Sequence, residues 1–305
     1  MPELPEVETI ARGLQKRVAG DVIESVWIGD KTNFLKSPAE EIARTLTGAR
    51  IESVQRVGKH LVIDVSRSAN LGGSQGPSRR KSRPARMHFA PSNATATFAG
   101  ARAPNSQAQW IVHLGMTGRM LVCRPAEPLA KHTHLVAQLA SGRELRFVDP
   151  RRFGKVQVTT GSRFKAAGSE PIGADRGEFA ALFRGRKTPI KSALLNQKLL
   201  SGIGNIYADE SLFRARVRPR RRAASLTRHE LKRLYDALQR VLAEAIAAGG
   251  SSVSDYVDAS GEAGFFQLHH RVYGREGKPC LVCKTPVKRV VIGGRSSHYC
   301  PKCQK

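Results

Sequence analysis

The sequence contains no hydrophobic run that approaches about 18 residues, the length at which a helix crosses a bilayer. Its first residues contain neither the basic segment nor the apolar stretch of a secretion signal. We therefore expect no membrane span and no targeting segment. The 305 residues are 40% hydrophobic, which is enough for packed cores in two domains or in one large domain.

Acidic residues are also scarce. The chain has 25 of them against 51 lysines and arginines, which gives a net charge of +26 and a pI of about 10.7. A surface with this balance attracts polyanions. Nucleic acid is the first candidate partner. An anionic membrane surface is the weaker candidate, because no basic amphipathic anchor helix stands out.

Cysteine is scarce too, and four of the five cysteines form two close pairs near the C-terminus. Sixteen residues separate the pairs, which is the spacing of a four-thiolate zinc ribbon. The predicted ligands are Cys280, Cys283, Cys300 and Cys303. Four thiolates leave no open position on the metal, so we expect one structural Zn²⁺ rather than a catalytic ion. Thiolates of this kind suit a reducing cytoplasm.

The residues between the cysteine pairs alternate like the two strands of a hairpin. The strands are expected at 287–292 and 295–299, around Gly293 and Gly294. Arg295 then lies at the hairpin tip, where its side chain is free to reach DNA. A unit of this size needs a staple such as zinc, because its own core is small.

The N-terminal half consists of an opening helix followed by many short β-rich runs. Apolar residues at helical spacing place the helix at residues 5–20, and a second short helix is expected at 39–47. The β-rich runs cover residues 22–28, 51–57, 61–65, 110–114, 119–123, 134–139 and 143–148. Repeated short strands predict an antiparallel sandwich or barrel.

One segment breaks this pattern. Residues 66–109 are dominated by Ser, Gly, Pro, Ala and Asn, and residues 67–109 contain seven Arg or Lys but no Asp or Glu. We interpret the segment as a disordered basic insertion. It either adds sequence-independent affinity for phosphates or is a neutral expansion of a surface loop.

The C-terminal half becomes helical, with helices expected at residues 191–200, 206–213 and 226–248. The chain is therefore predicted to be an α+β multidomain protein. The expected divisions are a β-sandwich domain at 1–165, a linker at 166–185, a helical domain at 186–250, an irregular loop at 251–278 and a zinc finger at 279–305.

A glycine-containing turn, residues 201–205, separates the first two of these helices. Asn205 suits the N-cap of the second helix. A helix N-terminus among basic residues is a phosphate site. A plain turn between two helices is nevertheless the commoner cause of such a pattern.

The first residues carry groups that can take part in catalysis. If Met1 is removed, Pro2 becomes a secondary amine with a pKa of about 7.7–8.0, so a useful fraction is neutral at cellular pH. Such an amine can form an iminium intermediate, and the adjacent Glu3 can act as a general acid or base. A frayed terminus or an ordinary helix start is the commoner reason for these residues.

A turn at residues 149–154 carries two arginines and a phenylalanine that it cannot bury together. Arg151 suits a base edge or a phosphate, and Phe153 suits insertion between bases. The alternative is a salt-bridged turn with Phe153 packed inward. Met116, on a turn flanked by glycines, is a similar wedge candidate, although a lone methionine is more often a core residue.

Several motifs together resemble the bacterial formamidopyrimidine-DNA glycosylases, enzymes that excise 8-oxoguanine. The resemblance covers nearly the whole chain, apart from the insertion, where the family has a short turn. The motifs are Met1–Thr9 (MPELPEVET), Val57–Leu61 (VGKHL), His113–Gly118 (HLGMTG), Asp149–Gly154 (DPRRFG) and Lys187–Glu210, together with the cysteine ribbon. The fifth of these motifs, residues 187–210, corresponds to the family's helix–two-turn–helix module.

The resemblance implies a role for each matching residue. Pro2 would be the nucleophile and Glu3 the proton donor, while Lys59 and Arg295 would act in the elimination steps. Met116, Arg151 and Phe153 would fill the space left by the everted nucleotide, with Arg151 facing the orphaned cytosine. The implied DNA-backbone contacts are His132, Arg186 and Asn205. From the sequence pattern alone, Lys59 is more typical of a solvated loop, and His132 is equally well an ordinary surface histidine.

The expected function is therefore a monomeric, bifunctional DNA glycosylase and AP lyase that acts on duplex DNA containing an oxidised purine. We expect it in the cytoplasm, on the nucleoid when bound to DNA. Residues 251–278 would cover the everted base. An endonuclease VIII-like enzyme for oxidised pyrimidines is the nearer alternative, against which Leu4 and the three wedge residues argue. A non-catalytic zinc-containing DNA-binding protein is the farther one.

Overall fold

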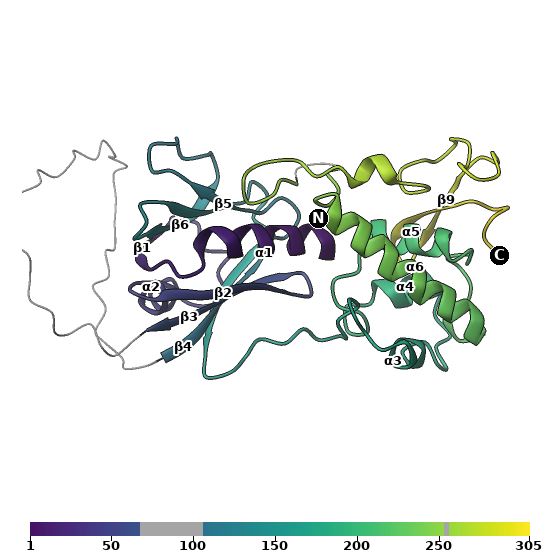
Figure 1. The fold of residues 1–305 in the computed structure, drawn as a ribbon, viewed down its shortest axis with the longest axis horizontal. Helices are drawn as coiled ribbons and strands as arrows, with labels where there is room; N and C mark the ends of the chain where they lie inside the picture. The colour runs from purple at the N-terminus through teal and green to yellow at the C-terminus, as the bar shows by residue number, and fades with distance from the viewer. Residues whose placement is uncertain (68–105, 253–255) are drawn as a thin grey trace, which may run out of the picture.

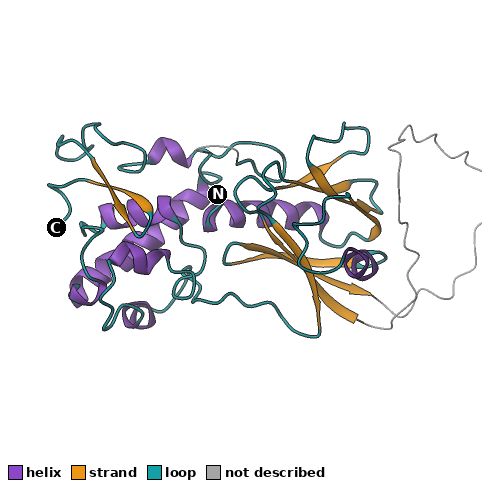
Figure 2. Cartoon of the chain, turned by 180° about the vertical axis from the view of Figure 1, so that it is seen from behind, coloured by secondary structure: helices purple, strands orange, loops and turns teal. Residues whose placement is uncertain are grey.

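The computed structural model describes residues 1–67, 106–252 and 256–305. A strand-rich half and a helical half lie side by side, and the amino end of the first helix lies where they meet (Figure 1). Seen from behind, most strands gather in one half, and most helices lie in the other half together with a short C-terminal strand pair (Figure 2). The predicted α+β architecture, with a sandwich, a helical part and a C-terminal hairpin, is confirmed.

Among the described residues of the strand-rich half, the strands form two antiparallel four-stranded sheets. The first has the order β1 (Ile23–Ile28), β6 (Thr133–Leu139), β7 (Glu144–Val148), β5 (Arg119–Cys123). The second has the order β2 (Arg50–Val57), β3 (His60–Arg67), β4 (Ser106–His113), β8 (Lys155–Thr160). Six of the seven expected strands are present within one or two residues, whereas β4 begins four residues before the expected start at 110. Strand β8 was not predicted, because its apolar residues alternate only over Val156 and Val158.

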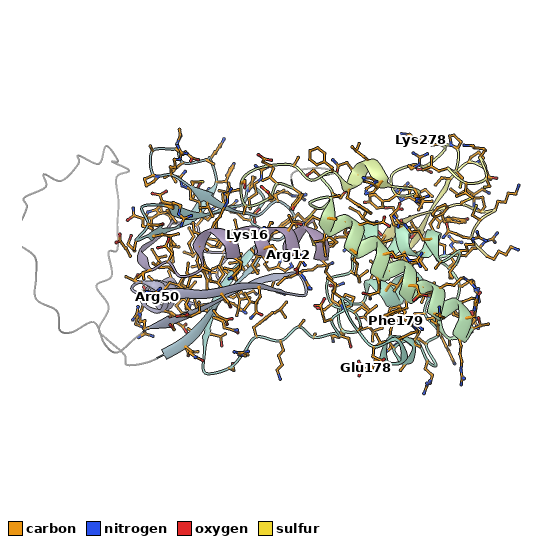
Figure 3. The ribbon with its side chains drawn as sticks, in the orientation of Figure 1. Arg12, Lys16, Arg50, Glu178, Phe179 and Lys278 are labelled. Atoms are coloured by element: carbon orange, nitrogen blue, oxygen red, sulfur yellow. The ribbon has the colours of Figure 1, made fainter. Side chains whose placement is uncertain are left out.

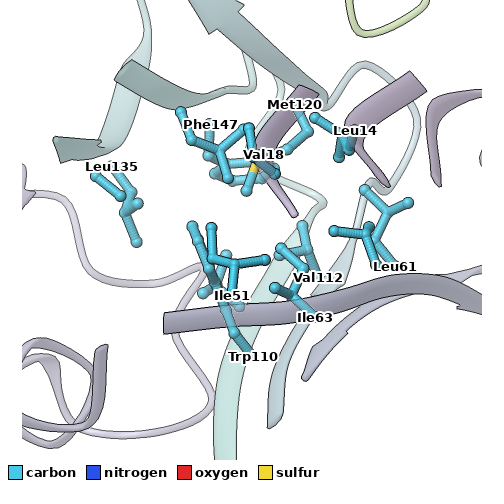
Figure 4. Close-up of a cluster of buried hydrophobic side chains, with 14 of the residues drawn as sticks. Leu14, Val18, Ile51, Leu61, Ile63, Trp110, Val112, Met120, Leu135 and Phe147 are labelled. Atoms are coloured by element: carbon cyan, nitrogen blue, oxygen red, sulfur yellow. The ribbon is translucent and has the colours of Figure 1, made fainter. Parts of the chain in front are cut away.

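Side chains from both sheets meet in one core. Trp110 and Ile63 come from the second sheet, and Phe147 comes from the first (Figure 4). Helix α1 (Leu4–Val18) adds an apolar stripe that includes Leu14 and Val18, as its spacing predicted. Burying each such side chain contributes about 1.5–3 kcal/mol. The second predicted helix is α2 (Ala39–Leu46).

The ends of the expected insertion belong to the sheet. Residues 66–67 finish β3, and residues 106–109 begin β4, where Asp64 pairs with Gln109. The expectation of disorder over 66–109 was therefore wrong at both ends, because backbone pairing extends the strands beyond their apolar residues. The middle of the insertion lies outside the described residues.

Four helices form the helical half: α3 (Arg176–Ala181), α4 (Ile190–Leu195), α5 (Asn205–Arg214) and α6 (Arg228–Ala247). Two short 3₁₀ turns accompany them, η1 (Ala223–Ser225) and η2 (Phe266–His269). Helix α6 begins at a capping box, in which Thr227 and Glu230 satisfy each other's backbone N–H groups.

This half differs from the expected elements at two places. The helix expected at 191–200 ends at Leu195, after which residues 196–200 form a turn. The segment expected to be a linker contains α3, which begins where the Asp175 side chain accepts a hydrogen bond from the Glu178 N–H (2.9 Å). Such an N-cap stabilises even a short helix.

The C-terminal hairpin consists of β9 (Lys288–Ile292) and β10 (Arg295–Tyr299), as expected.

Basic side chains lie on both halves of the molecule, among them Arg12, Lys16 and Lys278 (Figure 3). In the described part of the chain, no helix combines the length and the apolar character needed to span a bilayer.

A buried ion pair ties this hairpin to the helices. The Lys191 ammonium on α4 lies 2.6 Å from the Asp209 carboxylate on α5, and both side chains are fully buried. Lys191 also donates to the Ser296 carbonyl (2.6 Å), and the other carboxylate oxygen of Asp209 accepts from the His298 N–H (2.8 Å). Burial lowers the pKa of Lys191, and the Asp209 charge opposes that shift.

We expect Lys191→Met to lower the free energy of unfolding by about 3–5 kcal/mol, because it leaves the Asp209 carboxylate buried without its cation. Urea unfolding measures this change. Lys198→Met is the matched control, since Lys198 is exposed in the next turn and its loss should change stability by less than about 0.5 kcal/mol. Equal stabilities of the two variants would contradict the role given to the pair.

Candidate active site

The amino ends of two helices meet at Glu3. The Leu4 N–H of α1 donates to the Gly202 carbonyl (3.0 Å). The Glu3 carboxylate accepts hydrogen bonds from the N–H groups of Ile206 (3.1 Å) and Tyr207 (3.5 Å) in the first turn of α5. An anion at a helix N-terminus is stabilised by the unpaired N–H groups and the helix dipole.

Glu3 therefore caps α5 from a position 203 residues away in the sequence. The N-cap residue itself is Gly204, so the expectation that Asn205 holds this position was wrong. A Cβ atom at Gly204 would lie 2.1 Å from Cδ of Glu3, so only glycine leaves room for the carboxylate. Asn205 begins the helix instead, and its side-chain amide donates to the Ser296 hydroxyl (3.3 Å).

Pro2 is buried immediately before Glu3, whereas Met1 is half-exposed. The terminus is therefore an ordered helix start, packed between the two halves of the molecule. The Pro2 nitrogen is an amide while Met1 is attached. Removal of Met1 would place a secondary amine beside the Glu3 carboxyl group.

Lys59 reaches the same place from the β2–β3 turn. Gly58, with φ of +61°, lets this turn lie so close to residues 201–204 that a Cβ there would be 2.3 Å from the Ser201 hydroxyl oxygen. Lys59 is 9% exposed, and the charges of Glu3 and Arg295 both act on it. The structure thus brings together Pro2, Glu3, Lys59, Asn205 and Arg295 from four separate segments.

The electrostatics of this cluster favour proton transfer. Burial raises the pKa of Glu3 to about 7, the positive charge of Lys59 opposes this rise, and the charge of Glu6 adds to it. Burial lowers the pKa of Lys59, the Glu3 charge opposes this shift and the Arg295 charge adds to it. A carboxyl group with a pKa near 7 can donate a proton at neutral pH.

Glu6 is a site residue that the sequence analysis missed. It is buried, and burial raises its pKa. Its carboxylate accepts hydrogen bonds from the Glu3 N–H (2.7 Å), the Ser251 N–H (2.8 Å) and the Tyr207 hydroxyl. Its position three residues after Glu3 at a helix start was the available signal, because a capping box has this spacing.

The three wedge candidates gather on two neighbouring turns. Met116 is 39% exposed and Phe153 is 52% exposed, so neither is a core residue. The Arg151 guanidinium lies 4.9 Å from the centre of the Phe153 ring, a cation–π contact. Gly115 has a φ of +63°, and a Cβ there would lie 2.4 Å from the Gly154 nitrogen, so the two turns are in direct contact.

The remaining two predicted DNA contacts lie outside the catalytic cluster. His132 is exposed, with a φ of +71°, and its carbonyl accepts from the Asp149 N–H (3.0 Å) next to the wedge turns. Arg186 is exposed on the loop before α4, where its Nε donates to the Leu182 carbonyl (2.5 Å). The structure therefore places His132 next to the wedge turns and Arg186 in the helical half.

The four predicted zinc ligands form one cluster, in which all sulfur atoms lie within 4.8 Å of one another. The Sγ atoms of Cys280 and Cys303 are 3.9 Å apart, and those of Cys283 and Cys300 are 3.4 Å apart. A tetrahedron with Zn–S bonds of about 2.3 Å has edges of about 3.8 Å. The cluster therefore fits one structural Zn²⁺, which would fix the hairpin that carries Arg295.

Comparisons with known proteins agree with this geometry. Three family models match: the formamidopyrimidine-DNA glycosylase N-terminal domain over residues 1–156, the formamidopyrimidine-DNA glycosylase H2TH domain over residues 168–257, and the zinc finger found in FPG and IleRS over residues 277–305. The formamidopyrimidine-DNA glycosylase of Solibacter usitatus is 40% identical over 307 residues, with both chains fully covered.

Solved structures of Lactococcus lactis Fpg are also similar, at 29% identity with both chains fully covered. One is its complex with DNA containing N7-benzyl-Fapy-dG, with a TM-score of 0.80. Another is its complex with DNA containing an oxidised pyrimidine, with a TM-score of 0.79. The family models and the full-length relative together identify the chain. It belongs to the formamidopyrimidine-DNA glycosylase family.

Proposed function

We propose that this chain is a bifunctional DNA glycosylase and AP lyase that removes oxidised purines from duplex DNA. The observation that carries the proposal is the buried pair Pro2–Glu3 at the junction of the two halves, with Lys59 and Arg295 beside it. An amine, an acid with a pKa of about 7 and two cations are the groups that amine-based excision and phosphate elimination need.

Eviction of the damaged nucleotide would come first, because a base inside a duplex is inaccessible. Met116 and Phe153, which are exposed on adjacent turns, suit insertion into the stack. Arg151 would face the cytosine left without a partner. His132, Arg186 and Asn205 would hold the DNA backbone, because their polar side chains reach phosphates without reading the sequence.

Base removal would then use Pro2 after the loss of Met1. The amine attacks the sugar C1′ atom and gives up its own proton to the damaged base, which leaves as the bond from C1′ breaks. The Glu3 carboxyl group gives its proton to the ring oxygen, so that the bond from C1′ to this oxygen also breaks and the ring opens. The resulting iminium ion accepts electrons, which makes the C2′ proton acidic. Loss of that proton expels the 3′ phosphate, and a second elimination expels the 5′ phosphate.

Lys59 and Arg295 would assist the two eliminations, in which phosphates are the leaving groups. The lowered pKa of Lys59 leaves more of its amine neutral, and so available to accept a proton, than in an ordinary lysine. Arg295 stays charged and suits the phosphates flanking the lesion. Zinc at the four cysteines would supply no reactive position and would hold this hairpin in place.

We also propose the division of the chain that accompanies these roles. Residues 1–165 would form the catalytic sandwich domain and residues 186–250 the helix–two-turn–helix domain, joined by 166–185. Residues 251–278 would form the lesion-recognition loop and residues 279–305 the zinc finger. In the described part of that loop, the Ser251 N–H donates to Glu6 beside the catalytic cluster.

Excision of two lesions tests the function. Single-turnover excision from a duplex with 8-oxoguanine opposite cytosine should be at least about tenfold faster than excision of thymine glycol, corresponding to about 1.4 kcal/mol in transition-state stabilisation. Faster excision of thymine glycol would assign the chain to oxidised pyrimidines, as in the endonuclease VIII alternative. DNA binding without any cleavage would identify a non-catalytic DNA-binding protein.

The pH profile tests the acid and the amine together. The amine must be neutral, so the excision rate should fall below pH 7, since a terminal amine has a pKa of about 7.7–8.0. Glu3 must be protonated, so the rate should also fall above pH 8, because its pKa is about 7. We therefore expect a bell-shaped profile with its maximum near pH 7.5, measured as single-turnover excision at constant ionic strength.

One variant tests the assignment of Glu3, and a second serves as its control. Glu3→Gln should lose about 10²–10⁴-fold in excision, the usual contribution of a general acid. Glu178→Gln, which changes an exposed carboxylate on α3, should keep the wild-type bell. A wild-type rate that rises continuously to pH 9 would contradict the assignment of Glu3 as proton donor.

A further inference from the structure

Asp149 lies at the centre of the turns that carry the wedge, and its side chain is completely buried. Its backbone N–H donates to the His132 carbonyl (3.0 Å), and its backbone carbonyl accepts from Nε2 of His134 (2.9 Å). The backbone of Asp149 thus joins the turn at residues 149–154 to the loop that carries His132.

The Asp149 carboxylate holds both wedge turns. One oxygen accepts from the Thr117 hydroxyl (2.6 Å), and the other accepts from the Gly154 N–H (2.7 Å). The Arg151 N–H points at this same pair, 3.2 Å from the Thr117 hydroxyl oxygen and 3.3 Å from the carboxylate. One buried carboxylate therefore connects the turn of Met116 with the turn of Arg151 and Phe153.

Glycines make this connection tight. A Cβ at Gly154 would lie 3.0 Å from the His113 carbonyl oxygen, and a Cβ at Gly115 would lie 2.4 Å from the Gly154 nitrogen. The turns therefore touch through their backbones, with no side chain between them to yield. Hydrogen bonds to a charged acceptor are stronger than those between neutral groups, so the contact resists separation.

We propose that the Thr117–Asp149 pair positions the wedge. It holds the two turns in place, so that Met116, Arg151 and Phe153 do not shift relative to the sandwich when they displace a stacked nucleotide. The proposal rests on the proposed function. Displacing a base costs free energy, so the stacked bases exert a force against any side chain that enters between them. Exposed side chains on a loosely held turn would give way, whereas side chains on two turns joined at one buried carboxylate stay in place.

We expect the pair to affect the reaction rate strongly when the target base is stacked, and only slightly when the site has already lost its base. We would compare single-turnover excision of 8-oxoguanine with strand cleavage at a preformed abasic site in the same duplex. Thr117→Val keeps the side-chain shape and removes the hydroxyl group. We expect it to slow excision at least about tenfold, since small misplacements are costly, and to slow abasic-site cleavage less than about threefold.

Two further variants separate positioning from folding. Thr117→Ser keeps the hydroxyl and should restore excision to within about threefold of wild type. Ser53→Ala is the matched control, because it removes a hydroxyl that also donates to a carboxylate at 2.6 Å, on Asp64 in the other sheet. It should leave both reactions unchanged. All three variants should still fold and unfold cooperatively, with Thr117→Val modestly less stable because it removes a hydrogen bond to the buried Asp149 carboxylate.

A fluorescent base next to the lesion gives a readout that does not depend on turnover. 2-Aminopurine brightens when it is unstacked, so wild-type binding should brighten it more than binding of Thr117→Val at saturating protein. Equal brightening with equal excision would overturn the positioning role, as would equal loss on both substrates that Thr117→Ser does not restore. Wild-type brightening without excision or cleavage would instead contradict the proposed function and leave the positioning role standing.

Discussion

The contact between Glu3 and the amino end of α5 is the constraint on which the rest of the site depends. It joins the first helix of the strand-rich half to the helical half, and it does so at the residue next to the proposed nucleophile. Because a carboxylate caps the helix, the N-terminus of the chain cannot fray. The same contact requires glycine at residue 204, since any side chain there would collide with Glu3.

Burial at this junction sets the chemistry. Glu3 and Glu6 are both removed from water, and burial raises both of their pKa values. The positive charge of Lys59 on the β2–β3 turn opposes the rise at Glu3, and the charge of Arg295 on the C-terminal hairpin acts on Lys59. The hairpin is held in turn by the cysteine cluster and by the Lys191–Asp209 pair. Distant segments of the chain are therefore coupled through charge at one small site.

Local patterns in the sequence predicted the parts of the fold that rest on local causes. The apolar stripe of α1, the alternating strands and the spacing of the four cysteines each follow from the geometry of one element. Helix α3 and the end of α4 were misjudged, because single caps and turns decide them. The capping of α5 by Glu3 depends on a contact between residues 203 positions apart, which no local pattern records. For Glu6 the capping-box spacing was a local signal, but its hydrogen bond with the Tyr207 hydroxyl, 201 positions away, was not.

The most direct test of this account locates the covalent bond to DNA. Protein is incubated with a duplex that contains 8-oxoguanine, borohydride reduces the iminium ion during turnover, and peptide mapping by mass spectrometry identifies the modified residue. The account predicts that the sugar is attached to the nitrogen of Pro2 in chains that have lost Met1, with no adduct in chains that retain it. A sugar attached to Lys59 or another lysine would contradict it.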